Sequence, residues 1–289
     1  MESQQKTTTQ LLPEFEQSLT ELGRSPSTIL AYKADLEQLV DYLGKNNIQF
    51  ISDVKQDNLV NFRDYLSAQN YTPKSVSRKL NAIKTFFRWL KDKQYITNDV
   101  SKDVSHPETE STDPKFLTPM EYRALRDVAR TDIRIAAIVE LILQTGMRIS
   151  EVANLKLKNV KKDHLIVEPH ATQPQRTVPL NEAAQLALKD YLRERPQADS
   201  DYLFISKNGK QLAVRNIRAS IDRYMEKAEI PRYSVNDLRT TFIIENLRRG
   251  VDLVTISQVS GHKRLSTTER YLDLAGVKET GKKQELEQL

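Results

Sequence analysis

A polar stretch between two apolar, periodic halves most constrains how this chain of 289 residues can fold. Residues 105–114 read Ser-His-Pro-Glu-Thr-Glu-Ser-Thr-Asp-Pro, and no periodic apolar pattern crosses them. Such a segment has nothing to bury, so it connects two cores instead of belonging to one. We therefore predict an N-terminal domain over 1–104, a linker over 105–115, a second domain over 116–275 and a charged tail over 276–289.

The first hundred residues have the apolar spacing of amphipathic helices, with side chains recurring every three or four positions. Two of the helices should begin at Ser25-Pro26 and Thr72-Pro73, where a capping hydroxyl precedes a proline suited to the first helical position. The predicted helices lie at 11–22, 26–44, 57–68 and 73–93. The N-terminal domain is therefore predicted to be all-helical.

The second domain is also predicted to be mainly helical, beginning after a cap at Thr118-Pro119. Short strands are expected at 164–168, 176–180 and 202–205. The predicted fold class is thus mainly α with a small β-sheet in the C-terminal domain.

The predicted helix from Pro73 has one apolar face, and its other faces carry cations with almost no acid before Asp92. A solvated face usually mixes both signs, whereas a face of one sign suits a row of phosphates. The net charge of +5 is weak support by itself. The candidate DNA-binding residues are Lys74, Arg78, Lys79, Lys84, Arg88 and Lys91.

The second half of the chain carries residues suited to phosphoryl transfer. Arg148 and Arg239 can each hold phosphate oxygens through a planar, permanently charged guanidinium. Attack on a phosphodiester gathers negative charge, which these arginines and His262 can stabilise. Tyr271 is a candidate nucleophile, provided that neighbouring donors or cations favour its phenolate. Taken singly, each of these residues would be an ordinary surface residue.

Four boxes in order make the C-terminal half resemble the tyrosine recombinase and phage integrase family, in particular its compact Xer-like and transposon-borne members. The boxes are Thr145-Gly-Met-Arg148-Ile-Ser-Glu151, Asn236-Asp-Leu-Arg239, Ser260-Gly-His262 and Leu265-Ser-Thr-Thr-Glu-Arg-Tyr271. The resemblance implies a two-domain, C-shaped DNA clamp with a helical core-binding domain and a catalytic domain. It also implies DNA cleavage through a 3′-phosphotyrosyl bond, for integration, excision or resolution.

The resemblance implies a role for each site residue. Tyr271 would be the nucleophile, and Arg148 and Arg239 would clamp the phosphate. His262 would be a hydrogen-bond donor or an acid-base partner. Glu151 would orient Arg148 without contacting the phosphate itself. Asn236 would be a weaker hydrogen-bond donor at the position where the family usually has histidine.

The sequence departs from the family pattern in the hairpin that usually supplies a lysine general acid. The segment from Val167 to Leu180 keeps the pattern's second strand, but the lysine is missing. General acid catalysis is worth about 10²–10⁴ in rate, so a substitute is expected. The candidate replacements are His170, Lys158, Lys161 and Lys162.

Two other functions are compatible with these residues. A DNA-binding regulator that has lost catalysis would explain the missing lysine and would bind specific sites without covalent adducts. A type IB topoisomerase-like enzyme would relax supercoils without a specific site. We rank the regulator below the recombinase because the tyrosine, both arginines and the histidine are all present. We rank the topoisomerase below it because the small N-terminal helical unit looks more like that of a recombinase.

Composition limits the cofactors and partners. The chain has no cysteine, and its four histidines lack ligand spacing, so neither a metal nor another cofactor is expected. No apolar run approaches the ~18 residues of a membrane span, and the polar N-terminus is unlike a signal peptide, so we expect a cytoplasmic protein. The resemblance implies that its partners are double-stranded DNA and copies of itself, as a dimer on a site and a tetramer in synapsis. The tail over 276–289 would dock on a neighbouring protomer, and accessory proteins are compatible with this scheme.

Overall fold

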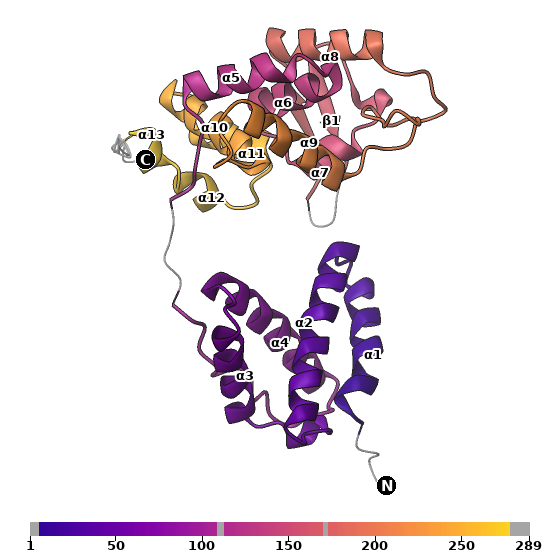
Figure 1. Cartoon of the computed structure of the whole chain (residues 1–289), viewed down its shortest axis with the longest axis vertical. Helices are drawn as coiled ribbons and strands as arrows, with labels where there is room; N and C mark the ends of the chain where they lie inside the picture. Colours follow the sequence, from indigo (N-terminus) through magenta and orange to yellow (C-terminus); the bar gives the residue numbers. More distant parts are fainter. Residues whose placement is uncertain (1–5, 109–112, 170–172, 278–289) are drawn as a thin grey trace, which may run out of the picture. The chain divides into compact units, whose positions relative to one another are not determined.

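The chain divides into two units, Met1–Thr112 and Asp113–Leu289. The computed structural model describes residues 6–108, 113–169 and 173–277. Each unit has its own core of buried apolar side chains. Figure 1 traces the helices of both units along the chain.

The N-terminal unit contains the four predicted helices. Its elements are α1 (Thr8–Glu21), α2 (Pro26–Lys45), the short 3-10 helix η1 (Ile51–Asp53), α3 (Gln56–Ala68) and α4 (Pro73–Asp92). The hydroxyls of Ser25 and Thr72 cap α2 and α4 by accepting hydrogen bonds from backbone amides of the first turn. Helix α2 packs against α1 and α4, and α3 packs against α4. The apolar faces predicted from the sequence enclose this core.

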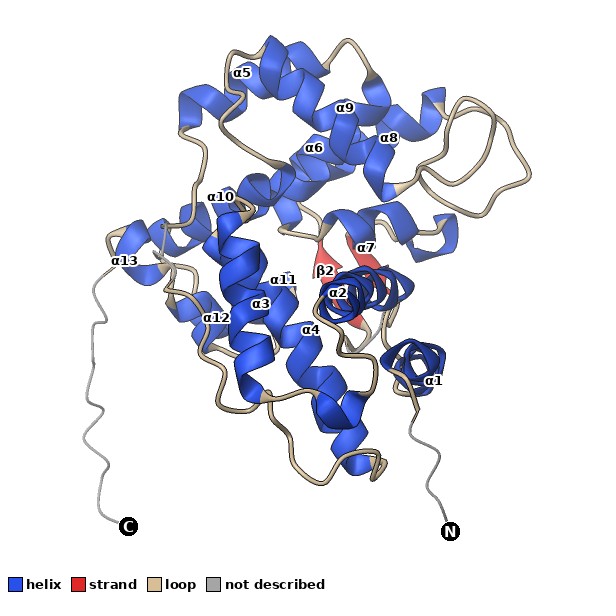
Figure 2. Cartoon of the chain, turned by 60° about the horizontal axis from the view of Figure 1, so that its bottom comes forward, coloured by secondary structure: helices blue, strands red, loops and turns tan. Residues whose placement is uncertain are grey.

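In its described residues, the C-terminal unit combines many helices with a small two-stranded sheet (Figure 2). Its helices are α5 (Pro119–Ala129), α6 (Ile133–Thr145), α7 (Ile149–Asn154), η2 (Leu157–Asn159), α8 (Glu182–Glu194), α9 (Val214–Lys227), α10 (Val235–Arg248), α11 (Leu253–Ser260), α12 (Ser266–Glu269) and α13 (Leu272–Ala275). Helix α6 is apolar on most sides because it packs against α5, α8, α9 and α10. The predicted class, mainly helical with a small sheet, is confirmed.

The sheet is an antiparallel pair of β1 (His164–Val167) and β2 (Arg176–Pro179). Its register places Arg176 opposite Val167, so Arg176 is the first residue of the returning strand. Strand β2 packs against α11. This contact brings the hairpin to the C-terminal end of a helix that begins more than seventy residues later in the sequence.

The predicted strand at 202–205 is wrong. Its ends make only isolated bridges, and Leu203, Phe204 and Ile205 are all buried, without the alternation of a strand. Side chains take several of its backbone hydrogen bonds: Tyr191 and Arg195 both donate to the carbonyl oxygen of Leu203. Because these backbone groups already have side-chain partners, the segment does not need hydrogen bonds from a neighbouring strand.

In the described ranges, no helix is both long enough and apolar enough to cross a bilayer. The predicted linker is described only in part, and most of the predicted tail lies outside the described residues.

Candidate active site

The last carbonyls of α11 and its cap each accept a hydrogen bond from an arginine of a different element. The bonds run from Arg176 Nε to Val259 at 3.0 Å, from Arg239 Nη1 to Ser260 at 2.7 Å, and from Arg148 Nη2 to Gly261 at 2.8 Å. Carbonyls at a helix C-terminus lack partners within the helix and carry partial negative charge, so cations are stabilised there. We call Arg148, Arg176 and Arg239 the arginine cluster.

Glu151 joins two members of this cluster. Its side chain is 5% exposed and accepts hydrogen bonds from Nη1 and Nη2 of Arg176, at 2.8 and 2.7 Å. Arg148 Nη1 donates to the same carboxylate at 3.1 Å. Burial alone would raise the pKa of Glu151, but the bonds and charge of Arg176, followed by those of Arg148, hold it below its usual value. Glu151 is therefore an anion at neutral pH.

A glycine turn sets the position of Arg148. Helix α6 ends at Thr145 and is capped by Gly146, which adopts a left-handed conformation with φ +62°. A Cβ there would lie 2.4 Å from the ring of Phe242. Two residues later Arg148 precedes the first turn of α7, and its amide donates to Glu151 at 2.8 Å. The backbone and the guanidinium of Arg148 are thus held by the same carboxylate.

Arg239 lies on α10 and is largely buried. Its Nη1 donates to the carbonyl oxygens of Gly146 and Ser260. Burial, and then the charge of Arg148, lower the pKa of Arg239 to about 10, so it stays charged at neutral pH. Within the described ranges its Nε and Nη2 have no hydrogen-bond partner. These donors are available to an anionic ligand.

Gly261 has two structural requirements. It ends α11 with φ +68°, a left-handed conformation that side chains rarely adopt. A Cβ at this position would lie 2.8 Å from Cζ of Arg176. The glycine therefore permits both the turn toward His262 and the close approach of Arg176.

His262 and Tyr271 lie beside the cluster. Their rings stack with centroids 6.5 Å apart and an angle of 12° between the planes. Nδ1 of His262 lies 2.7 Å from Oγ1 of the buried Thr268. Burial, and then the charges of Arg239 and the other nearby arginines, lower the pKa of His262 to about 4. The imidazole is therefore neutral at pH 7.

The structure brings together five of the predicted site residues, namely Arg148, Glu151, Arg239, His262 and Tyr271. Asn236 is exposed on α10, three residues before Arg239, and its side-chain amide has no partner among the described residues. Arg176 is a site residue that we did not predict. Its signal is the second strand of the hairpin, where the family pattern has an arginine shortly after the lysine and this sequence keeps that arginine.

Three of the four candidate general acids lie among the described residues. Lys158 is 69% exposed and pairs with Glu168 at 3.1 Å. Lys161 and Lys162 are also exposed. In the described part of the chain, none of these lysines forms a hydrogen bond or ion pair with Glu151 or with a carbonyl that the arginine cluster bonds. His170 lies outside the described residues.

The cationic face of α4 differs from the prediction at one position. The prediction of Lys79 as an exposed cation is wrong: the residue is 7% exposed, and its Nζ lies 2.9 Å from the buried carboxylate of Asp35 on α2. Arg78 forms two hydrogen bonds with the same carboxylate but is about half exposed. Lys74, Arg88 and Lys91 are exposed, and Lys84 is partly exposed.

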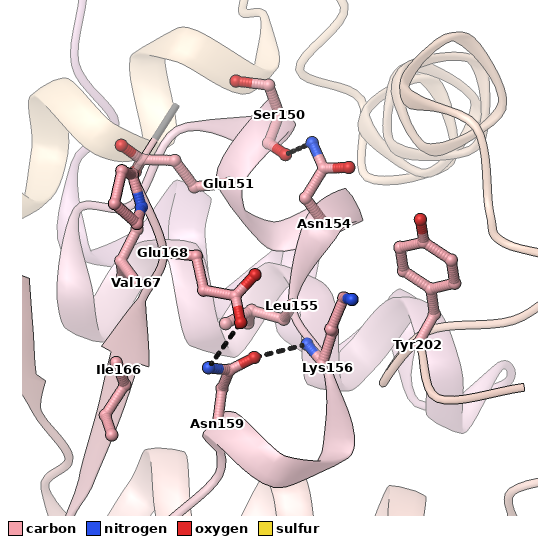
Figure 3. A pocket seen from close by; sticks show the side chains of 11 residues that line it. Ser150, Glu151, Asn154, Leu155, Lys156, Asn159, Ile166, Val167, Glu168 and Tyr202 are labelled. Carbon is pink, nitrogen blue, oxygen red and sulfur yellow. Dashed lines mark hydrogen bonds between the residues drawn. The ribbon is translucent and has the colours of Figure 1, made fainter. Parts of the chain in front are cut away.

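A hollow of about 220 Å³ lies between α7, η2 and β1, and Figure 3 shows the side chains that line it. Asn159 donates to Glu168 there at 3.4 Å and accepts from the backbone amide of Lys156 at 3.2 Å. Glu151 belongs to its wall, but no arginine does. Because its polar groups bond to each other and Glu168 would repel a phosphate, we place the reactive site at the arginine cluster instead.

The arginine cluster suits an anion. The site contains three guanidinium groups and one carboxylate, which bonds two of them, and the imidazole is neutral, so two positive charges are unbalanced. A phosphodiester attacked by a phenolate carries two negative charges, one from each reactant. Across the described ranges, no group of three or more His, Asp or Glu side chains is arranged to hold a metal ion. The two unbalanced positive charges of the cluster match the charge of the attacked phosphodiester and can stabilise phosphoryl transfer.

Comparison with known proteins identifies both units. Residues 115–276 match the model of the phage integrase family, and residues 12–94 match that of the phage integrase N-terminal SAM-like domain. Tyrosine recombinase XerC of Caldanaerobacter subterraneus subsp. tengcongensis is 32% identical over 277 residues, covering 86% of this chain and 78% of that protein. Tyrosine recombinase XerC of Roseiflexus sp. (strain RS-1) is 29% identical over 264 residues, covering 87% and 84%.

Solved structures share the fold. A post-cleavage complex of the XerH site-specific recombinase with a palindromic difH substrate has a TM-score of 0.75 at 20% identity, covering 93% of this chain and 81% of that chain. A lambda integrase tetramer bound to a Holliday junction has a TM-score of 0.72 at 17% identity, covering 90% and 78%.

Proposed function

This chain belongs to the phage integrase family, and from that premise we propose that it cuts and rejoins DNA at specific sites through a 3′-phosphotyrosyl intermediate. The observation that carries the proposal is the arginine cluster bonded to the end of α11, beside the His262 and Tyr271 rings. It places cations, a neutral imidazole and a phenol within one site. As a reaction class, this is site-specific DNA recombination.

The covalent step follows from these groups. The Tyr271 oxygen attacks phosphorus, the new P–O bond forms, and the bond from phosphorus to the 5′-oxygen breaks. The phenol proton leaves to solvent, and the 5′-oxygen takes a proton from a general acid. A 5′-hydroxyl from a second strand reverses the step and releases the tyrosine. The bond energy is conserved throughout, so no nucleotide cofactor is required.

The arginines stabilise the charge that develops on the non-bridging oxygens. The free donors of Arg239 would bind one oxygen, and Arg148 the other, because their remaining N–H groups are already oriented by the α11 carbonyls. Donors fixed before the reaction need no reorganisation during it. Asn236, three positions before Arg239 on α10, would supply a further amide donor.

The general acid remains a proposal among four residues: His170, Lys158, Lys161 and Lys162. The last three lie between α7 and β1, so they come just before the hairpin that usually carries the lysine. Binding of DNA would have to bring one of them to the 5′-oxygen. Single substitution of each, followed by cleavage of a substrate with a 5′-thio leaving group that needs no proton, would identify which one acts.

The proposed partners are double-stranded DNA and further copies of this chain, two on a site and four in synapsis. Accessory proteins are compatible with this assembly. On the N-terminal unit, the exposed cations Lys74, Arg78, Arg88 and Lys91 of α4 would bind phosphates. A duplex bound in this way would be positioned through its backbone.

The test is a nicked suicide duplex made from DNA that flanks the protein's own gene. We expect wild-type protein, but not Tyr271→Phe, to give a protein–DNA adduct that survives denaturation. The phenylalanine variant keeps the ring against His262 and loses only the hydroxyl, so it is a matched control. Tight binding of the duplex without any adduct would contradict the proposal and favour a regulator, and relaxation of supercoils lacking the site would favour a topoisomerase.

A further inference from the structure

Thr268 forms a hydrogen bond with His262, and the proposed reaction gives this threonine no role. It is fully buried in α12, three residues before Tyr271, and its Oγ1 lies 2.7 Å from Nδ1 of His262. Among the described residues this hydroxyl has no other hydrogen-bond partner. A serine or threonine hydroxyl has one proton to donate, and a buried donor without an acceptor is costly.

This contact restricts where the imidazole carries its proton. If Nδ1 donated to Thr268, the buried hydroxyl proton would have no acceptor. If Thr268 donates to Nδ1 instead, both atoms are satisfied and the ring proton lies on Nε2. The hydrogen bond made by one ring nitrogen thus decides whether the other ring nitrogen carries the proton.

We propose that Thr268 is a positioning residue that holds His262 in the Nε2–H tautomer by donating its hydroxyl proton to Nδ1. The amide of His262 donates to the carbonyl oxygen of Ser257 at 2.9 Å, which fixes the backbone at the start of the loop. Stacking on Tyr271 fixes the ring plane. With its proton on Nε2, His262 donates a hydrogen bond and does not accept the proton of the attacking tyrosine.

This assignment deepens the proposed function and rests on it only for its catalytic meaning. The sequence left His262 as either a donor or an acid-base partner. The Nε2–H tautomer selects the donor, directed at a phosphate oxygen. The tyrosine proton must then leave by a route that does not include this imidazole.

The experiment is nitrogen NMR of the free protein, labelled with ¹⁵N at histidine and measured at pH 7 without DNA. The chain has four histidines, so His262→Asn assigns the signal. We expect wild type to show one protonated nitrogen, Nε2, and one unprotonated nitrogen, Nδ1. Thr268→Val keeps the shape but loses the donor, and should move the two nitrogen shifts toward each other as the Nδ1–H form appears. Thr268→Ser keeps the hydroxyl and should restore the wild-type pattern.

A protonated Nδ1 or an even mixture in wild type overturns the assignment. Nitrogen shifts in Thr268→Val that equal those of wild type overturn it too. Should the valine variant fail to fold, the wild-type and serine spectra still decide which nitrogen carries the proton. The measurement needs no DNA, so it is independent of the adduct assay that tests the recombinase.

Discussion

Arg176 donates two hydrogen bonds, at 2.8 and 2.7 Å, to the buried carboxylate of Glu151. The two residues come from β2 and α7, and a third bond from Arg176 reaches the end of α11. Because Glu151 also bonds Arg148, this pair connects the hairpin to a residue that would hold the phosphate. The hairpin is thus part of the support for the proposed site.

Replacing Arg176 with methionine should destabilise the protein and slow cleavage. Removing one partner of a buried ion pair costs about 3–5 kcal/mol, because the remaining charge stays buried. Denaturant unfolding measures this cost, and Arg176→Met combined with Glu151→Gln should recover part of it. The control is Arg130→Met, since the Arg130–Asp127 pair is exposed and worth about 0–1 kcal/mol. Equal losses in both methionine variants would contradict the buried-pair argument.

Arg148→Lys should reduce covalent adduct formation by about 10²–10³, the cost of losing one oriented donor to a developing negative charge. Lysine keeps the charge but cannot reproduce the planar fork that contacts Glu151 and the α11 carbonyls. Adduct yield against time gives the rate, and fluorescence anisotropy shows whether DNA binding survives. A variant as fast as wild type would remove Arg148 from the proposed mechanism, while Arg130→Lys should change neither quantity.

Gly261→Ala should impair both stability and cleavage, and Gly250→Ala only stability. Both glycines have positive φ, +68° and +79°, so alanine costs about 1–2 kcal/mol at either position. Only at Gly261 would the new Cβ also meet Arg176, whereas nothing lies within 4 Å at Gly250. Unfolding and adduct assays on both variants separate the two effects. Normal cleavage by Gly261→Ala would show that Arg176 can move without consequence.

Stability should fall as the pH is lowered from about 6.5 to about 4, partly because of His262. Its pKa is about 4 in the folded protein and ~6.5 when unfolded, so in this window only the unfolded chain binds the proton. At ~1.4 kcal/mol per pH unit the effect is at most about 3 kcal/mol, and it is smaller because the ring is only partly buried. Unfolding at pH 7 and pH 5 should show a weaker pH dependence for His262→Gln than for wild type. An identical dependence would mean that another group titrates.

Arg88→Met should weaken DNA binding without loss of stability, and Lys79→Met should do the reverse. Arg88 is exposed on α4, whereas Lys79 is buried against Asp35. Removing one cation that neutralises a phosphate should lower the slope of log affinity against log salt by about 0.9. Binding at several salt concentrations and unfolding of both variants test the assignment. A steep fall in affinity in Lys79→Met at unchanged stability would contradict it.

The sequence predicted the helices well because their capping residues and apolar spacing are local. Ser25, Thr72 and Thr118 all cap helices as expected. It also predicted which catalytic candidates meet, since Arg148, Arg239, His262 and Tyr271 lie in boxes with known order. Contacts between distant segments were not predictable in this way.

The two clearest differences between prediction and structure both involve contacts between segments that are distant in the sequence. The burial of Lys79 depends on Asp35, which lies 44 residues earlier on another helix. The role of Arg176 depends on Glu151, 25 residues earlier, and on Val259, 83 residues later. Neither relation repeats along the chain, so no periodicity reveals it.

Asp35 holds one exposed cation of α4 by hydrogen bonds and leaves others without such bonds. Arg78 is held by two bonds to this carboxylate yet remains about half exposed, whereas Arg88 is exposed and has no ion pair in the described ranges. A side chain ordered before binding loses less rotamer entropy when it contacts a ligand. On a bound duplex, Arg78 would therefore contact a phosphate at a fixed position and set the position of α4 along the DNA. The other exposed cations of α4 would adjust their side chains to the local groove width.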